Sequence, residues 1–94
     1  MAYRPIITLT TDFGTNDHFV GAMKGVIVDI VPEVQIVDIS HAVQAFDVLD
    51  GALAISQAYS YFPNGTIHMV VVDPGVGTNR RPILASSDGY HFVA

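Results

Sequence analysis

Apolar residues recur along this chain with two different spacings, and the spacing predicts which segments are helices and which are strands. Over residues 17–31 and again over 48–59 they return every three or four positions, which predicts two helices that each bury one wide apolar face. Shorter β-rich runs that end at polar, proline or glycine residues predict strands. The predicted strands are 5–10, 34–39, 66–73, 82–86 and 90–93.

The order of these elements predicts an α/β fold. Strand, helix, strand, helix and strand, followed by a hairpin, are typical of a layered sandwich with a mainly parallel sheet and right-handed crossovers. The unbroken apolar run at residues 69–72 supports this interpretation, because strands of parallel sheets are buried on both faces. Residues 87–89 (Ser-Asp-Gly) predict the hairpin turn, and Thr15 or Asn16 is expected to cap the first helix.

Composition narrows the classes of function. At 94 residues, half of them hydrophobic, the chain is expected to form one globular unit around a single core. No apolar run approaches the ~20 residues that a membrane-spanning helix needs, and the first residues lack a signal-peptide pattern, so we expect a cytoplasmic protein without a membrane partner. The formal charge of −5 argues against a nucleic-acid partner and favours a cationic small molecule.

Candidate chemistry lies where the predicted parallel strands end. Ligands of open parallel sheets bind beyond the carboxyl ends of the strands, and an aspartate falls at each of the three ends, as Asp12, Asp38 and Asp73. A carboxylate can accept two hydrogen bonds side by side, which suits the vicinal hydroxyls of a ribose, and Asp12, close to Gly14, is best placed for that role. Each aspartate taken alone has a second interpretation, as a loop residue that caps a turn or a helix.

The glycine-rich segment after the third predicted strand is expected to bring the side chain of Arg80 toward Asp73. The glycines between Asp73 and Arg80 allow the loop to fold back, so that the carboxylate and the guanidinium face the same small volume. A dinucleotide fingerprint does not fit, because its third glycine would fall at Arg80 and because Pro82 leads into a strand rather than a helix. The alternative is that Arg80 and its neighbour Arg81 are solvated surface charges.

The histidines give little support for a metal site. None of the four has the helical pair spacing of metal ligands, and the chain has no cysteine, so each histidine is expected in the core or on the surface. His41 is a partial exception, since it follows Asp38 at the end of a predicted strand. We therefore expect neither a metal nor a cofactor.

Several motifs, taken in order, resemble a known family. They are Thr11-Asp12-Phe13-Gly14 with Asp17 and Lys24-Gly25, then Asp38-Ile39-Ser40-His41, Tyr61-Phe62-Pro63-Asn64-Gly65-Thr66, and residues 72–81. Together they resemble the S-adenosyl-L-methionine (SAM) hydrolases that form adenosine. These enzymes are also called SAM hydroxide adenosyltransferases, and they are relatives of fluorinase and chlorinase. The resemblance runs from about Arg4 to Ala94.

The resemblance implies a reaction and an assembly. The implied reaction is metal-independent hydrolysis of the substrate SAM to adenosine and L-methionine by an SN2 displacement at the ribose 5′ carbon. The implied protein is a homotrimer with active sites at subunit interfaces. In it residues 1–94 belong to an N-terminal α/β domain, and a C-terminal barrel-like domain follows. We therefore expect an incomplete N-terminal domain that is inactive alone; the alternative is a natural short chain whose last strand closes the sheet.

The resemblance also implies which residues bind the substrate. Asp12 matches the family's ribose-holding aspartate, and Asp17 matches an acid near the methionine amine. Phe46 matches an aromatic wall of the nucleoside pocket, and Val76 is expected to line the same site.

Asp73 and Arg80 match two members of an Asp-Arg-His set that is associated with activating water, and its histidine is expected beyond Ala94. The halogenating relatives carry tyrosine or another residue where this chain has Asp73, so Asp73 favours water over halide as the nucleophile. Two alternatives stay open. One is halide-dependent cleavage of SAM in the same pocket, and the other is a nucleoside-binding or assembly module without turnover.

Overall fold

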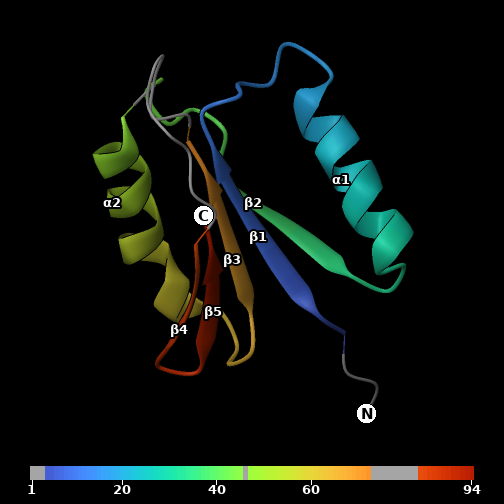
Figure 1. Ribbon diagram of the computed structural model, residues 1–94, viewed down its shortest axis with the longest axis vertical. Helices are drawn as coiled ribbons and strands as arrows, with labels where there is room; N and C mark the ends of the chain where they lie inside the picture. The colour runs from blue at the N-terminus through green and yellow to red at the C-terminus, as the bar shows by residue number, and fades with distance from the viewer. Residues whose placement is uncertain (1–3, 46, 73–82) are drawn as a thin grey trace.

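The predicted order of elements is present in the computed structural model, which describes residues 4–45, 47–72 and 83–94 (Figure 1). The elements are β1 (Ile6–Thr11), α1 (Phe19–Ile30), β2 (Gln35–Ser40), α2 (Val48–Ala58), the 3-10 turn η1 (Tyr59–Tyr61), β3 (Ile67–Val71), β4 (Leu84–Ser87) and β5 (Tyr90–Val93). Their bounds differ from the predicted ones by a residue or two. Two of the predicted strand ends, at residues 73 and 82, lie outside the described residues.

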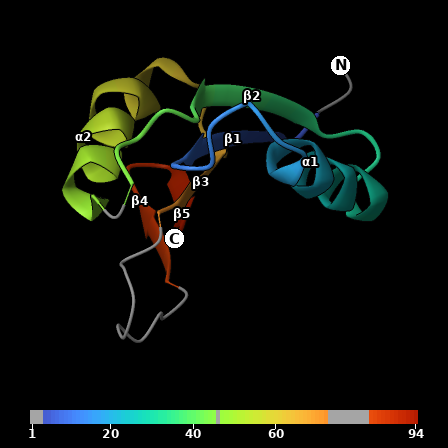
Figure 2. The same cartoon turned by 90° about the horizontal axis from the view of Figure 1, so that it is seen from above.

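The strand order reverses at β1. The sheet runs β2-β1-β3-β5-β4, and β1 pairs in parallel with both β2 and β3. After β1 the chain forms β2 on one side of that strand, and it then returns to form β3 on the other side. Right-handed crossovers then put α1 and α2 on opposite faces of the sheet, as Figure 2 shows. β5 pairs in parallel with β3 and antiparallel with β4. The predicted layered sandwich with a mainly parallel sheet is therefore confirmed.

The hydrophobic core lies between α1 and one face of the sheet. Leu9 in β1 has no exposed surface, and Ile7, Ile27 and Val34 are nearly as buried. Burial of one such side chain contributes about 1.5–3 kcal/mol. Packed against this cluster are Met23, Val31, Ile36, Ile67 and Met69. This packing holds α1 on the sheet and so fixes the far end of the loop that leaves β1.

Both helices also expose apolar side chains. Phe19, Val26 and Ile30 on α1, and Leu49 and Leu53 on α2, are each more than half exposed. The prediction that each helix buries one wide apolar face is therefore wrong in part, because apolar spacing along a helix does not show how much of the face the sheet covers. No helix in the part of the chain that the structure describes combines the length and the apolar character that crossing a bilayer needs.

Gly51 allows α2 to approach the sheet closely. This glycine is buried, and a Cβ built on it would lie 2.9 Å from Cγ2 of Val72 and 3.5 Å from Cγ1 of Val70. The helical spacing predicted a helix here despite the glycine. The structure supplies the reason for the glycine, because a larger residue would overlap the side chain of Val72.

We expect Gly51→Ala to lower the free energy of unfolding by about 1 kcal/mol. Alanine stabilises a helix relative to glycine by up to about 1 kcal/mol, whereas overpacking a closed contact costs about 1–3 kcal/mol. We expect the overpacking cost to be the larger effect, because the new Cβ would lie only 2.9 Å from Cγ2 of Val72. Urea unfolding measures the change. The matched control is Gly25→Ala in α1, where a Cβ meets nothing within 4 Å and alanine should stabilise. Stabilisation by both variants would contradict this account of Gly51.

The hairpin turn is shorter than the three residues predicted. Ser87 pairs with Tyr90, so that only Asp88 and Gly89 connect β4 to β5. Their φ angles are 54° and 82°. Positive φ at both central residues defines a type I′ turn, for which Asp-Gly is a favoured sequence.

The predicted cap of the first helix is wrong. His18, and not Thr15 or Asn16, occupies the N-cap position of α1, and its side chain makes no capping bond. Oδ1 of Asp17 instead accepts the Phe19 N–H at 3.1 Å. Several consecutive polar residues precede α1, and each can accept a bond from a helix N–H. Spacing in the sequence therefore does not select one of them.

Candidate functional site

Asp12 follows β1 at the point where the strand order reverses. Thr11 pairs with Val71 of β3, and the N–H of Asp12 donates to the carbonyl of Val71 at 3.4 Å. In open α/β sheets ligands bind at such a switch point, beyond the carboxyl ends of the strands. Asp12 thus lies at the edge where this class of fold binds ligands, and its role as a binding residue stays a prediction.

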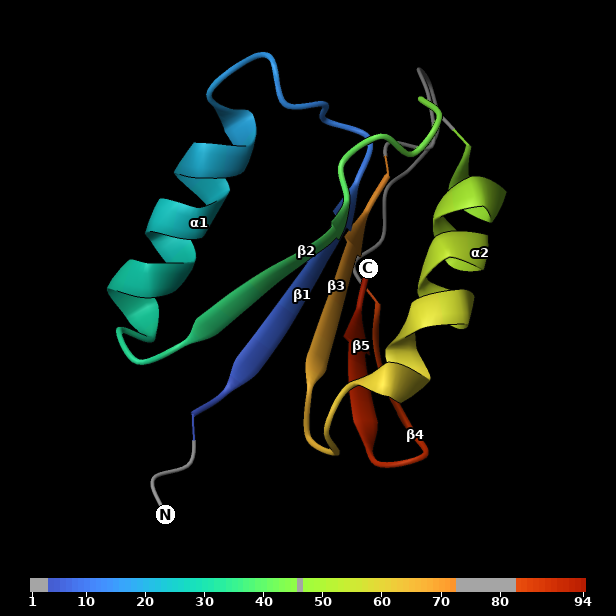
Figure 3. The same cartoon turned by 180° about the vertical axis from the view of Figure 1, so that it is seen from behind.

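The loop from β1 to α1 and the loop from β2 to α2 lie at the same end of the sheet (Figure 3). They touch through the backbone, since the N–H of Gly14 donates to the carbonyl of His41 at 2.8 Å. Gly14 has φ +72°, and a Cβ there would meet nothing within 4 Å. The left-handed backbone, and not a lack of space, is therefore the reason for a glycine two residues after Asp12.

Asp17 lies on the same loop as Asp12, at the end where the loop joins α1. It is exposed, and its carboxylate accepts the Phe19 N–H as described above. The loop thus carries two carboxylates, one at the start and one at the end. The placement agrees with a site that holds a cationic ligand, although the role predicted for Asp17 is not tested by it.

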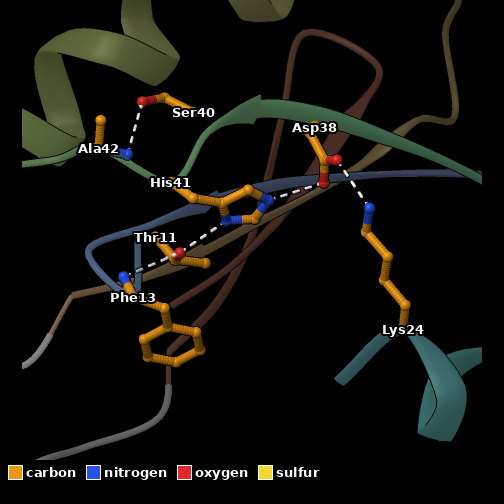
Figure 4. A network of polar contacts seen from close by, with 7 residues as sticks. All are labelled: Thr11, Phe13, Lys24, Asp38, Ser40, His41 and Ala42. Carbon is orange, nitrogen blue, oxygen red and sulfur yellow. Dashed lines mark hydrogen bonds and ion pairs between the residues drawn. The ribbon is translucent and has the colours of Figure 1, made fainter. Parts of the chain in front are cut away.

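Asp38 lies two residues before the end of β2, and two cationic or polar side chains contact its carboxylate (Figure 4). Lys24 Nζ is 2.7 Å from Oδ2, and His41 Nε2 is 2.7 Å from Oδ1. Burial acts to raise the pKa of Asp38, but the hydrogen bonds and charges of Lys24 and His41 outweigh it, so that the pKa falls below the ordinary 3.8.

His41 joins Asp38 to the end of β1. Its side chain is buried, and Nδ1 lies 2.7 Å from Oγ1 of Thr11. Hydroxyl, imidazole and carboxylate are thus in line, as in a serine-hydrolase triad. However, the hydroxyl contacts Nδ1 and the carboxylate contacts Nε2, which reverses the arrangement of that triad. Thr11 also has no exposed surface, so it cannot attack a substrate.

The sequence indicated part of this network. The spacing of Asp38 and His41 singled out His41, and Lys24 belongs to one of the motifs that carry the resemblance. Nothing in the sequence linked either residue to Thr11, which is 30 positions before His41. Pairing of β1 with β2 brings them together.

The remaining histidines lie in the core or on the surface, as predicted. His68 in β3 is fully buried among aromatic rings, with Nδ1 2.7 Å from Oγ1 of Thr8. Burial lowers the pKa of His68, because the charged ring would lose its hydration. His18 and His91 are exposed. Within the described ranges, no group of three histidine, cysteine or acidic residues could hold a metal ion.

Four predicted site residues lie outside the residues that the structure describes. They are Phe46, Asp73, Val76 and Arg80. Their placement and roles stay predictions from the sequence.

Comparison with known proteins finds relatives that carry the names of enzymes. The chain is 45% identical over 93 residues to an (R)-S-adenosyl-L-methionine hydrolase of Methanocaldococcus jannaschii, covering 94% of this chain and 35% of the relative. It is 47% identical over 90 residues to the (R)-S-adenosyl-L-methionine hydrolase of Salinispora tropica, covering 95% and 34%. A fluorinase of Nocardia brasiliensis is 39% identical over 80 residues, covering 85% and 27%.

The fold is also present in solved structures. An uncharacterized conserved protein from Thermotoga maritima superposes with a TM-score of 0.84 at 39% identity, over 93% of this chain and 34% of that one. This chain thus spans about a third of the length of the hydrolases and of the structure that it matches. A model of one protein family matches residues 7–94, and the chain accordingly belongs to the family described as the SAM hydroxide adenosyltransferase N-terminal domain.

Proposed function

We propose that this protein hydrolyses SAM to adenosine and L-methionine. The observation that carries the proposal is the position of Asp12, at the switch point of the sheet, in a chain that belongs to this family. The relatives named (R)-S-adenosyl-L-methionine hydrolase support it, at 45% and 47% identity. The negative charge of the chain is consistent with a cationic sulfonium substrate.

The proposed reaction is a displacement at one carbon. The oxygen of a water or hydroxide forms a bond to the ribose 5′ carbon while the bond from that carbon to sulfur breaks. The electron pair goes to sulfur, which leaves as the neutral thioether of methionine, and one proton of the water is released. Because a sulfonium is already a good leaving group, the protein has to supply orientation and a desolvated nucleophile, and no metal is needed.

The residues described by the structure would bind the two ends of the substrate. Asp12 would accept hydrogen bonds from both ribose hydroxyls, and Asp17 would pair with the amino group of the methionine part. Their positions on one loop are consistent with a single elongated ligand. Phe46 and Val76, which lie outside the described residues, would line the nucleoside pocket.

Asp73 and Arg80 are the proposed catalytic pair. Asp73 follows Val72 in the sequence, two residues past the end of β3, and β3 is the strand beside Asp12. The pair would hold the attacking water together with a histidine beyond Ala94, as the resemblance implies. We further propose a cytoplasmic homotrimer in which a barrel-like domain follows this one. The exposed apolar side chains of α1 and α2 are surfaces that further chain or another subunit could cover.

Reaction in ¹⁸O-water tests the proposed displacement. We expect the label in the 5′ oxygen of adenosine and none in methionine, because the new bond joins the water oxygen to the 5′ carbon. The protein expressed from the complete coding sequence is incubated with SAM, and both products are analysed by mass spectrometry. Label in methionine, or adenosine without label, would contradict the mechanism.

Halide transfer is the second candidate, and the fluorinase relative favours it. Its lower identity and the aspartate at position 73 make hydrolysis the better-supported reaction. The same incubation with added fluoride or chloride separates the two. We expect adenosine in every case, and release of halogenated adenosine would establish the alternative.

A further inference from the structure

His41 contacts the chain on both sides of Asp12. Its ring reaches Thr11, the residue before Asp12, through the 2.7 Å contact between Nδ1 and Oγ1. Its backbone carbonyl accepts the N–H of Gly14, two residues after Asp12, at 2.8 Å. Figure 4 shows the ring lying between Thr11 and Asp38. His41, in the β2–α2 loop, therefore holds the backbone on both sides of Asp12, the residue that is proposed to bind the ribose.

Two groups contact the hydroxyl of Thr11. Oγ1 accepts the N–H of Phe13 at 3.2 Å and also lies 2.7 Å from Nδ1 of His41, a contact in which either atom can donate. At the other side of the ring, Nε2 of His41 donates to Oδ1 of Asp38 at 2.7 Å, because a carboxylate only accepts. Both ring nitrogens of His41 therefore have a partner, and the two contacts hold the ring in one position.

Asp38 connects the network to the other end of the same loop. Lys24, which projects from α1, bonds to Oδ2 of Asp38 at 2.7 Å. This ion pair is partly exposed, with side chains 35% and 40% accessible, so its own contribution to stability is small. Its effect on geometry is larger. Through Asp38 it links α1, where the loop ends, to the imidazole of His41, which contacts Thr11 at the start of the loop.

We propose that His41 is a positioning residue for Asp12, acting through the hydroxyl of Thr11, with Asp38 and Lys24 fixing the plane of its ring. This inference rests on the proposed function, in which Asp12 binds the ribose. His41 does not touch the substrate in this account. It determines whether the Asp12 carboxylate stands in the orientation that accepts two hydroxyls.

Two substitutions of His41 distinguish the two hydrogen bonds that its ring makes, because each substitution keeps one and removes the other. The amide of His41→Asn can replace Nδ1 and keep the bond to Thr11, whereas the longer amide of His41→Gln can replace Nε2 and keep only the bond to Asp38. We expect His41→Gln to raise the Kd for adenosine about tenfold, the size of effect that follows when a buried hydroxyl loses its partner. We expect His41→Asn to change that Kd less than about threefold, because the contact with Thr11 is retained.

His68→Gln is the matched control. It alters a second buried histidine that also contacts a buried threonine hydroxyl through Nδ1 at 2.7 Å, but in β3 and away from the loop. Like His41→Gln, it removes the contact with the threonine hydroxyl. We expect it to lower the melting temperature and to leave the Kd for adenosine unchanged at temperatures well below melting. Calorimetry on the protein from the complete coding sequence gives the Kd values. A loss of affinity in His68→Gln equal to that in His41→Gln would show a general effect of stability and overturn the inference.

Amide hydrogen exchange without ligand provides a readout that does not need the proposed function. The N–H groups of Phe13 and Gly14 should exchange faster in His41→Gln than in His41→Asn or His68→Gln. Unchanged exchange and affinity in His41→Gln would overturn the positioning role. If the unaltered protein bound no adenosine, the proposed function would fail, and the exchange rates alone would decide whether His41 holds this loop.

Discussion

Asp73→Asn and Arg80→Ala are each expected to lower kcat by about a hundredfold or more, with less than about a threefold change in the Kd for adenosine. Both residues are proposed to act on the attacking water and not on the nucleoside. Removing an interaction that is made mainly in the transition state lowers kcat and kcat/KM together and leaves ground-state binding in place. Steady-state kinetics with SAM and calorimetry with adenosine measure the two quantities.

The physical reason is orientation and not general base catalysis. An arginine stays protonated at any working pH, and an aspartate beside it stays ionised and is a weak base. A water held between them and the histidine expected beyond Ala94 would present a lone pair to the 5′ carbon, opposite the departing sulfur. Asparagine at position 73 keeps the size of the side chain but loses the charge, so it would hold this water in a different orientation.

Two controls make this prediction specific. Asp88→Asn removes an aspartate from the hairpin turn, where asparagine also tolerates positive φ, and should leave kcat unchanged. Arg81→Ala removes the neighbouring guanidinium and should likewise have little effect. If Asp73→Asn and Arg80→Ala kept the original kcat and lost affinity for adenosine, both residues would be binding residues, and the proposed mechanism would have to be abandoned.

Asp12→Ala is expected to weaken adenosine binding by at least about tenfold. Hydrogen bonds to a charged group contribute about 1.5–3 kcal/mol each, and about 1.4 kcal/mol corresponds to tenfold in Kd. Loss of both ribose contacts therefore exceeds this threshold even after relaxation. Calorimetry gives the Kd, and circular dichroism checks that the fold is intact. An unchanged Kd in a folded variant would return Asp12 to the role of a loop residue that caps a turn.

Asp17→Asn serves as the internal comparison for Asp12. Asparagine keeps an oxygen that can accept the Phe19 N–H, so the start of α1 is preserved while the charge is lost. Because Asp17 is proposed to face the methionine part, this variant should weaken SAM binding and leave adenosine binding unchanged. Equal losses of affinity for SAM and for adenosine would show that Asp17 acts on the whole site through its charge, and not on the methionine part alone.

The fold was predictable because each element carries its own local pattern. Part of the three- and four-residue spacing in α1 reflects the face that covers Leu9, and Asp88-Gly89 specifies its turn through backbone conformation. The α/β order then leaves few topologies, since right-handed crossovers place α1 and α2 on opposite faces. The cap of α1 was not predictable, because several adjacent polar side chains are equivalent in the sequence and only the packed helix selects where its first turn begins.

Patterns along the chain were enough to predict the α/β order, the family resemblance and the position of Asp12 after a strand. They did not predict the contacts of Asp38. In the folded chain Asp38 accepts bonds from Lys24 and His41, and His41 in turn reaches Thr11 from 30 positions away. The physical reason is that these bonds depend on the parallel pairing of β1 with β2 and on the seating of α1. Such contacts between distant segments leave no periodic signal along the chain.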